Sequence, residues 1–151
     1  MKFLTTLIIL SISLTLAGSA IAQDSRPVAL NRLLTASEIV DREPQGESAE
    51  FSSDGNRVYV FVDVYNPDTE GGELTMTWTH EGGSSHSQTV EYGQSRRWRT
   101  WAARRMNERQ EGEWTVTVTN SQGEVLGEVS FEVVPSIPAG GMAALEEEFG
   151  C

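Results

Sequence analysis

The stretch Arg57-Val58-Tyr59-Val60-Phe61-Val62-Asp63-Val64-Tyr65 decides the fold, because its side chains alternate between two sets over nine residues. Valine occupies every second position, and the positions between hold two tyrosines, a phenylalanine and one aspartate. A strict period of two with β-branched residues is typical of a β-strand. Both faces carry large hydrophobic groups, so we expect this strand to be buried on both sides.

The same alternation recurs on either side of this stretch, separated by Gly, Pro, Asn and Asp turn signals. The predicted strands are Glu38–Arg42, Arg57–Tyr65, Leu74–His80, His86–Tyr92, Arg96–Trp101, Glu113–Thr119 and Glu124–Val134. Residues Glu43–Ser48 read as a polar loop, and Ala102–Met106 as a helical turn. About seven short antiparallel strands at this spacing predict an all-β, immunoglobulin-like sandwich over residues 37–134.

The N-terminus predicts export. A positive Lys2 precedes an apolar stretch that ends at Ala17, and Ala20-Ile21-Ala22 fits a small-residue cleavage site. The stretch is shorter than the about 20 apolar residues that span a bilayer. We therefore expect a signal peptide over residues 1–22 and a periplasmic or secreted mature protein, with an uncleaved anchor as the alternative and no stable membrane insertion after cleavage.

The mature chain of 129 residues (151 − 22) is acidic and contains no lysine, since Lys2 leaves with the signal peptide. Ten arginines against 22 acidic residues give a formal charge of −12. Long-range repulsion then argues against nucleic acid or an anionic membrane as a partner. Residues 23–36 read as a linker, and residues 135–151 as a flexible C-terminal tail.

Cys151 is the single cysteine, so no intramolecular disulfide can form. It is also the last residue of the chain. Two interpretations remain open: an intermolecular disulfide that links a dimer, or an incidental exposed thiol.

A basic cluster carries the most chemical content, because six of the ten mature arginines lie within fourteen residues. Its members are Arg96, Arg97, Arg99, Arg104, Arg105 and Arg109. Guanidinium forks bind carboxylates and phosphates in a bidentate manner, so the cluster predicts recognition of an anion. The structural alternative is that these arginines pair with acids on neighbouring strands and stack over aromatic rings.

Four tryptophans raise the possibility of stacking against sugar rings. Trp78 and Trp114 are in phase with their apolar neighbours and are expected in the core. In a strand, Arg97, Arg99 and Trp101 share the face opposite Trp98. One of Trp98 and Trp101 is therefore expected to point outward.

The chain shows no catalytic or cofactor signature. His80 and His86 flank a Gly/Ser-rich loop and could form a weak metal site with Glu81, but no third ligand has a recognisable spacing. Loop-flanking histidines without a metal are the simpler interpretation. Ser84 and Ser85 fit a flexible hairpin, and no nucleophile elbow occurs. We expect no enzyme activity, no cofactor and no metal.

Several motifs together resemble the bacterial domain of unknown function family 2914. They are Ile39-Val40-Asp41-Arg42-Glu43-Pro44, Val58-Tyr59-Val60-Phe61, Trp78-Thr79-His80-Glu81-Gly82, Arg97-Trp98-Arg99-Thr100-Trp101 and Gly112-Glu113-Trp114-Thr115-Val116. The resemblance runs from about Ala36 to Val134. It implies a small all-β module of an exported or membrane-attached bacterial protein and no reaction, and the Gly/Ser-rich segment before Arg97 departs from the family pattern.

Two functions follow as hypotheses. In the first, a noncatalytic interaction module recognises an anionic peptide, a glycan or an envelope protein through its Arg/Trp segment. The binding residues are then Arg96, Arg97, Trp98, Arg99, Trp101, Arg104 and Arg105. In the second, an exposed tryptophan makes the domain a carbohydrate-binding module. Salt separates the two, because ionic strength weakens the first kind of contact far more than the second.

Overall fold

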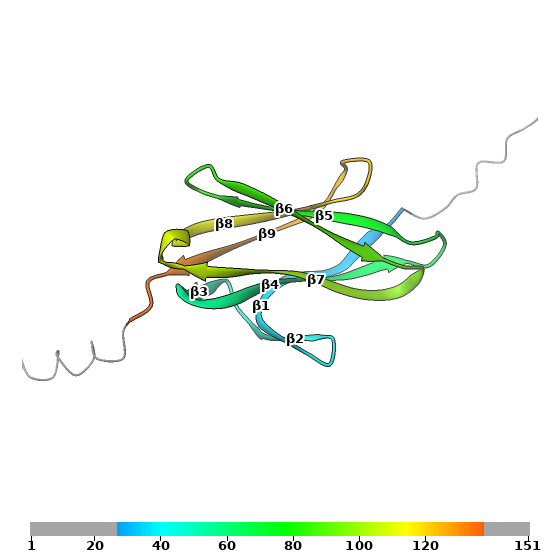
Figure 1. The fold of residues 1–151 in the computed structure, drawn as a ribbon. Coiled ribbons are helices and arrows are strands. Elements are labelled where there is room, and N and C mark those ends of the chain that lie inside the picture. The colour runs from blue at the N-terminus through cyan, green and yellow to red at the C-terminus, as the bar shows by residue number, and fades with distance from the viewer. Residues whose placement is uncertain (1–26, 138–151) are drawn as a thin grey trace, which may run out of the picture.

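The computed structural model describes residues 27–137, which form nine strands and one short 3-10 helix (Figure 1). The strands are β1 (Ala29–Val40), β2 (Glu43–Glu47), β3 (Glu50–Ser52), β4 (Asp54–Asn66), β5 (Gly72–His80), β6 (Ser85–Tyr92), β7 (Ser95–Asn107), β8 (Gly112–Thr119) and β9 (Val125–Val134). The predicted all-β sandwich is confirmed, with nine strands instead of seven. The predicted signal peptide, most of the predicted tail and Cys151 lie outside the described residues.

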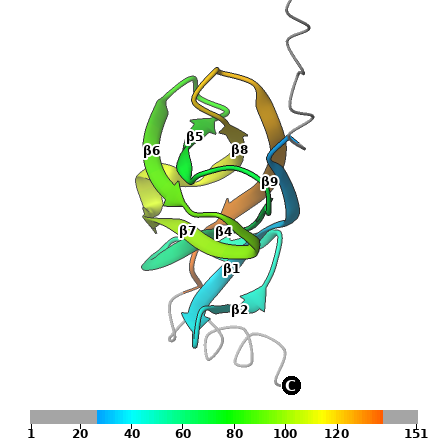
Figure 2. The ribbon, with the colours of Figure 1, turned by 90° about the vertical axis from the view of Figure 1, so that its right-hand side faces the viewer.

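The strands form two facing sheets (Figure 2). Sheet A has the order β2-β1-β4-β7, and sheet B has the order β3-β9-β8-β5-β6. All neighbouring strands are antiparallel except β3 and β9, which are parallel. Among the described strands, β7 and β6 are therefore edge strands of their sheets, and contacts between them join the two sheets on one side.

Strand β4 lies between β1 and β7 at the centre of sheet A. Its four valines are at most 2% exposed and face sheet B, in the main core. On the opposite face, Phe61 is fully buried and Asp63 is 2% exposed. The expectation that this strand is buried on both sides is confirmed.

Strands β5 and β8 supply the opposing half of the core. Their inward positions hold Trp78 and Trp114, both at most 2% exposed, so these two predictions are confirmed. Trp78 meets Phe131 of β9 edge to face, with ring centroids 6.1 Å apart. Threonines occupy the outward positions, as the period of two requires.

The N-terminal part of the fold differs from the prediction. Strand β1 begins at Ala29, so the expected linker is wrong from Ala29 onward, and β1 pairs with β4 from Ala29↔Tyr65 to Ala36↔Tyr59. The chain then reverses at Asp41 and Arg42 (φ 50° and 63°), and Val40 pairs with Glu43. The predicted loop Glu43–Ser48 is therefore largely strand β2, because a tight two-residue turn precedes it.

Strand β7 also differs from the prediction, since its thirteen residues continue through the expected helical turn. Pairing with β4 extends along this whole region, for example Val60↔Ala102 and Val58↔Arg104. Ala102 and Met106 enter the core. Helical structure appears only afterwards, at Glu108–Gln110, capped by the Asn107 side chain. No helix within residues 27–137 is long and apolar enough to cross a membrane.

Candidate functional site

Strand β7 divides the Arg/Trp segment between its two faces. Trp98 packs against the main core between the sheets, whereas Trp101 packs against a small cluster on the outer face of sheet A. Arg97 and Arg99 lie on the same outer face as Trp101, as predicted. Both indoles are half-buried, so neither tryptophan is the freely exposed platform that the sequence led us to expect.

The outer-face arginines are held by two acids. Glu43 accepts from Arg99 at 2.5 Å, from Arg97 at 3.2 Å and from Arg32 at 3.3 Å. Buried Asp63 accepts from Arg97 at 2.8 Å. The hydrogen bond to Asp63 and the charge of Glu43 raise the pKa of Arg97 above its usual value. At Arg97 and Arg99, the arrangement matches the structural alternative.

These ion pairs cover a second, smaller core. Its buried members are Leu34, Ala36 and Phe61, with Trp101 packed against them. The Arg32 guanidinium lies 5.4 Å from the centroid of the Phe61 ring, in cation–π geometry. Glu43 belongs to β2, so its ion pairs with Arg97 and Arg99 connect the β1–β2 hairpin to β7 across the outer face of sheet A. These side chains stabilise the fold.

The remaining arginines of the segment are dispersed. Arg104 points between the sheets and stacks over Trp114, 5.2 Å from the ring centroid. Arg105 donates a long hydrogen bond to the Gly55 carbonyl at 3.4 Å. Within residues 27–137, no ion pair is formed by Arg96, Arg104, Arg105 or Arg109. The structure therefore does not bring the six arginines together as one anion site.

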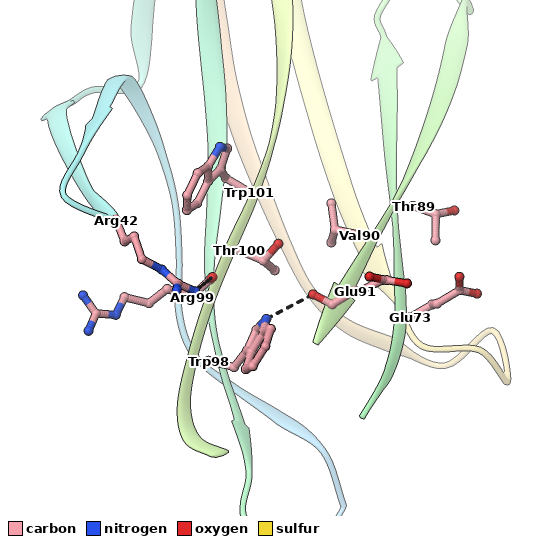
Figure 3. Close-up of a pocket in the computed structure, with 9 residues that line it drawn as sticks. All are labelled: Arg42, Glu73, Thr89, Val90, Glu91, Trp98, Arg99, Thr100 and Trp101. Carbon is pink, nitrogen blue, oxygen red and sulfur yellow. Dashed lines mark hydrogen bonds between the residues drawn. The ribbon is translucent and has the colours of Figure 1, made fainter. Parts of the chain in front are cut away.

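A groove of about 600 Å³ runs where the edges of the two sheets approach each other (Figure 3). Its lining comes from the β1–β2 turn and from strands β5, β6 and β7: Arg42, Glu73, Thr89, Val90, Glu91, Trp98, Arg99, Thr100 and Trp101. Arg42 and Arg99 lie on one side and Glu73 and Glu91 on the other, with the Trp98 ring between them. The groove thus offers an indole, hydroxyls and charges of both signs.

The position of Trp98 is fixed on two sides. Its Nε1 donates to the Glu91 carbonyl at 3.1 Å, which joins β7 to β6. A Cβ at Gly93 would lie 2.7 Å from the Trp98 ring, so only glycine leaves space for the indole there. Trp98 is therefore a rigid element of the groove.

Side chains also occupy backbone acceptors along the edge of β7. Arg42 Nη2 donates to the Arg99 carbonyl at 3.1 Å, and Gln88 Nε2 donates to the Ala103 carbonyl at 3.2 Å. Protected edges of this kind resist pairing with a further strand. The groove is thus poorly suited to hold a peptide by strand addition.

Arg42, Glu73 and Glu91 were missed as groove residues by sequence reasoning. Glu73 and Glu91 are cross-strand partners, so the register of β5 and β6 places them together. Glu91 lies in the outward phase of one predicted strand, and Glu73 directly precedes another, so their positions were a usable signal. No signal placed Arg42, which is 57 residues from Arg99, beside β7.

The histidines lie at different positions in the β5–β6 hairpin. His80 Nε2 bonds with the Glu111 carbonyl at 2.8 Å, and its Nδ1 accepts from the Gly82 amide at 3.2 Å. His86 is exposed and pairs in register with Trp78. Both ring nitrogens of His80 form hydrogen bonds, and within residues 27–137 no three His, Cys, Asp or Glu side chains are placed so that they could hold a metal ion together.

The charges segregate between the two sheets. The strands of sheet A carry seven arginines: Arg32, Arg57, Arg96, Arg97, Arg99, Arg104 and Arg105. The strands of sheet B carry six glutamates and no arginine: Glu50, Glu73, Glu91, Glu113, Glu128 and Glu132. One sheet is therefore basic relative to the other in a protein that is acidic overall.

Comparisons with known proteins identify a family but no activity. The family described as "Protein of unknown function (DUF2914)" matches residues 72–133, from β5 into β9. This confirms the resemblance drawn from the motifs, over a shorter range than expected. The match leaves out Arg42, Glu43 and Asp63, which lie before residue 72. No curated protein gives a significant match.

One solved structure with similarity is that of Pseudomonas fluorescens alkylpurine DNA glycosylase AlkC bound to DNA containing an abasic site analog. The sequence identity is 14% and the TM-score is 0.49. The match covers 70% of this chain and 30% of that protein, so this chain spans less than a third of its length.

Proposed function

We propose that this chain, whose residues 72–133 match the DUF2914 family of unknown function, is a noncatalytic glycan-binding module. The groove between the edges of β6 and β7 holds the ligand. After removal of residues 1–22, the module works outside the cytoplasm. The observation that carries the proposal is the rigid Trp98 in a groove lined by hydroxyls, carboxylates and guanidinium groups.

The lining suits a polyhydroxylated ligand. Sugar rings present apolar C–H faces that pack on an indole, and their hydroxyls both donate and accept hydrogen bonds. Thr89, Thr100, Glu73 and Glu91 supply acceptors, and Arg42 supplies donors. A volume of about 600 Å³ lies within the usual range for ligand sites, about 300–1,000 Å³.

Two alternatives receive less support. A polyanion needs several free guanidinium groups, but Arg97 and Arg99 already pair with Glu43 and Asp63. Arg96, exposed and without an ion pair in residues 27–137, is the observation that keeps an anionic partner as a second candidate. A peptide added as a strand is disfavoured by the side chains that cap the edge of β7.

The test is a titration of the mature protein with neutral and uronic-acid oligosaccharides, followed by indole fluorescence and calorimetry. We expect at least one oligosaccharide to bind, with affinity that persists at 0.5 M NaCl because stacking is insensitive to salt. Trp98→Leu should abolish this binding, and unfolding curves check that the variant still folds.

Glu128→Gln is the matched control, since Glu128 lies in β9 outside the groove lining. It should bind like the wild type. The proposal is wrong if no oligosaccharide binds, or if binding is unchanged in a folded Trp98→Leu variant. Binding of polyanions alone, lost at high salt, would favour the second candidate.

A further inference from the structure

We infer that Arg42 recognises a carboxylate on the ligand, so that the bound glycan contains an acidic sugar. This inference rests on the proposed function and adds the chemical class of the ligand. Three independent features of Arg42 carry it: its backbone conformation, its pairing and its place in the groove.

Arg42 is held in an unfavourable backbone conformation. It occupies the second position of the two-residue turn between β1 and β2, with φ 63°. Positive φ at both positions of such a turn strongly favours Asn-Gly or Asp-Gly. Asp41 fits its position, but an arginine at the second has a Cβ that disfavours positive φ. Glycine there would stabilise the turn, so the arginine at this position has a cost in stability.

Arg42 also differs from its neighbours in pairing. Arg32, Arg97 and Arg99 each contact an acid, whereas Arg42 forms no ion pair within residues 27–137. Its side chain donates to the neutral carbonyl of Arg99 and is otherwise exposed. A guanidinium has five N–H donors, so most of them stay available to a ligand.

The groove places this guanidinium where it can act on a ligand beside Trp98. Arg42 and Arg99 lie on one side, and Figure 3 shows Glu73 and Glu91 on the other. Of the two arginines that line the groove, Arg99 already pairs with Glu43, so Arg42 is the one available to bind an anionic ligand. The opposing glutamates repel a carboxylate, so an acidic sugar on Trp98 turns its carboxylate toward Arg42. A planar guanidinium binds that group with two parallel hydrogen bonds.

The experiment compares sodium glucuronate with glucose in an NMR titration that follows the arginine Nε–H and indole N–H signals. Glucuronate should shift the Arg42 and Trp98 signals and bind about tenfold more tightly than glucose, as one charge-assisted hydrogen-bond pair allows. Arg42→Gly should remove this tenfold preference. Arg57→Ala removes an exposed arginine outside the groove and should keep the preference.

Thermal unfolding supplies a readout that does not depend on sugar. Arg42→Gly should raise the melting temperature, because it relieves the turn, while Arg42→Lys should not. A lower melting temperature for Arg42→Gly overturns the inference, because Arg42 would then act as a structural brace. Equal binding of glucuronate and glucose also overturns it and leaves a glycan module standing, whereas absence of binding by every oligosaccharide overturns both.

Discussion

At the scale of single residues, Asp63 is the exception in a strand of hydrophobic side chains. It is 2% exposed, and a buried carboxylate is tolerated only when it is paired and hydrogen-bonded. Arg97 donates to it at 2.8 Å and Asn31 at 3.3 Å. The Arg97 guanidinium therefore contacts two acids: Asp63 on β4 and Glu43 on β2 of the β1–β2 hairpin.

Replacing this carboxylate should destabilise the fold. We expect Asp63→Asn to lower the free energy of unfolding by about 2 kcal/mol, because hydrogen bonds to a charged group are lost. Urea unfolding measures the change. Asp68→Asn, at an exposed loop position, is the control and should change stability by less than about 0.5 kcal/mol. Equal effects of the two substitutions would contradict the role given to Asp63.

At the scale of elements, the sequence predicts strands best where the residue type alternates with a period of two. Strands β4, β5 and β8 were predicted closely because apolar and other residues alternate along them. Strand β7 was predicted only in part, since Ala102 and Ala103 favour helix locally while pairing with β4 overrides that preference. The β1–β2 turn was missed because Arg42 is not a residue that such turns favour.

The candidate site was predictable to a similar extent. Three of the seven binding residues proposed from the sequence, Trp98, Arg99 and Trp101, line the groove, whereas Arg96, Arg97, Arg104 and Arg105 do not. The acid that neutralises its arginines, Glu43, lies more than 50 residues earlier in the chain. Only the tertiary path of the hairpin brings it to β7. Periodicity within one strand cannot supply a contact of that kind.

The β1–β2 hairpin is predicted to depend on the ion pairs of Glu43. Glu43→Gln should lower the free energy of unfolding by about 1 kcal/mol at low salt, because three guanidinium groups then lose their shared anion. At 1 M NaCl the difference should shrink. Glu47→Gln, on the same strand without an ion pair in residues 27–137, is the control. A salt-independent effect would argue against an electrostatic role.

Strand β1 belongs to the folding unit, and truncation tests this. A chain that begins at Pro27 should fold cooperatively, as seen by circular dichroism and thermal unfolding. A chain that begins at Ser37 lacks every β1 residue that pairs with β4, including the buried Leu34 and Ala36, and it should not fold. Cooperative unfolding of the shorter chain would restore the interpretation of residues 23–36 as a linker.

At the scale of the whole molecule, the unequal distribution of charge lowers the stability of sheet B, which carries glutamates but no arginine. Glu132 on β9 is directly opposite Glu113 on β8 and Glu50 on β3, so three carboxylates form one row. Like charges at directly opposite positions are destabilising. Nothing in the strands of this sheet compensates them, because they contain no arginine.

Relieving this row should stabilise the protein. We expect Glu132→Gln to raise the free energy of unfolding by about 0.5 kcal/mol at low ionic strength, with little gain at high salt. Glu70→Gln, in an exposed loop, should give no comparable gain. Chemical unfolding at two salt concentrations separates the outcomes, and equal gains from both substitutions would mean that only total charge matters.

Sheet A carries the seven arginines of the strands and sheet B six glutamates without an arginine, and this unequal distribution also makes the molecule an electric dipole. In a uniform medium this has little effect, but the net negative charge and the dipole act differently near a charged surface. The net charge slows the approach to an anionic wall, whereas the dipole exerts a torque that turns sheet A toward it. The molecule would then arrive with one preferred orientation, its hairpin and the Arg42 side of the groove facing the wall.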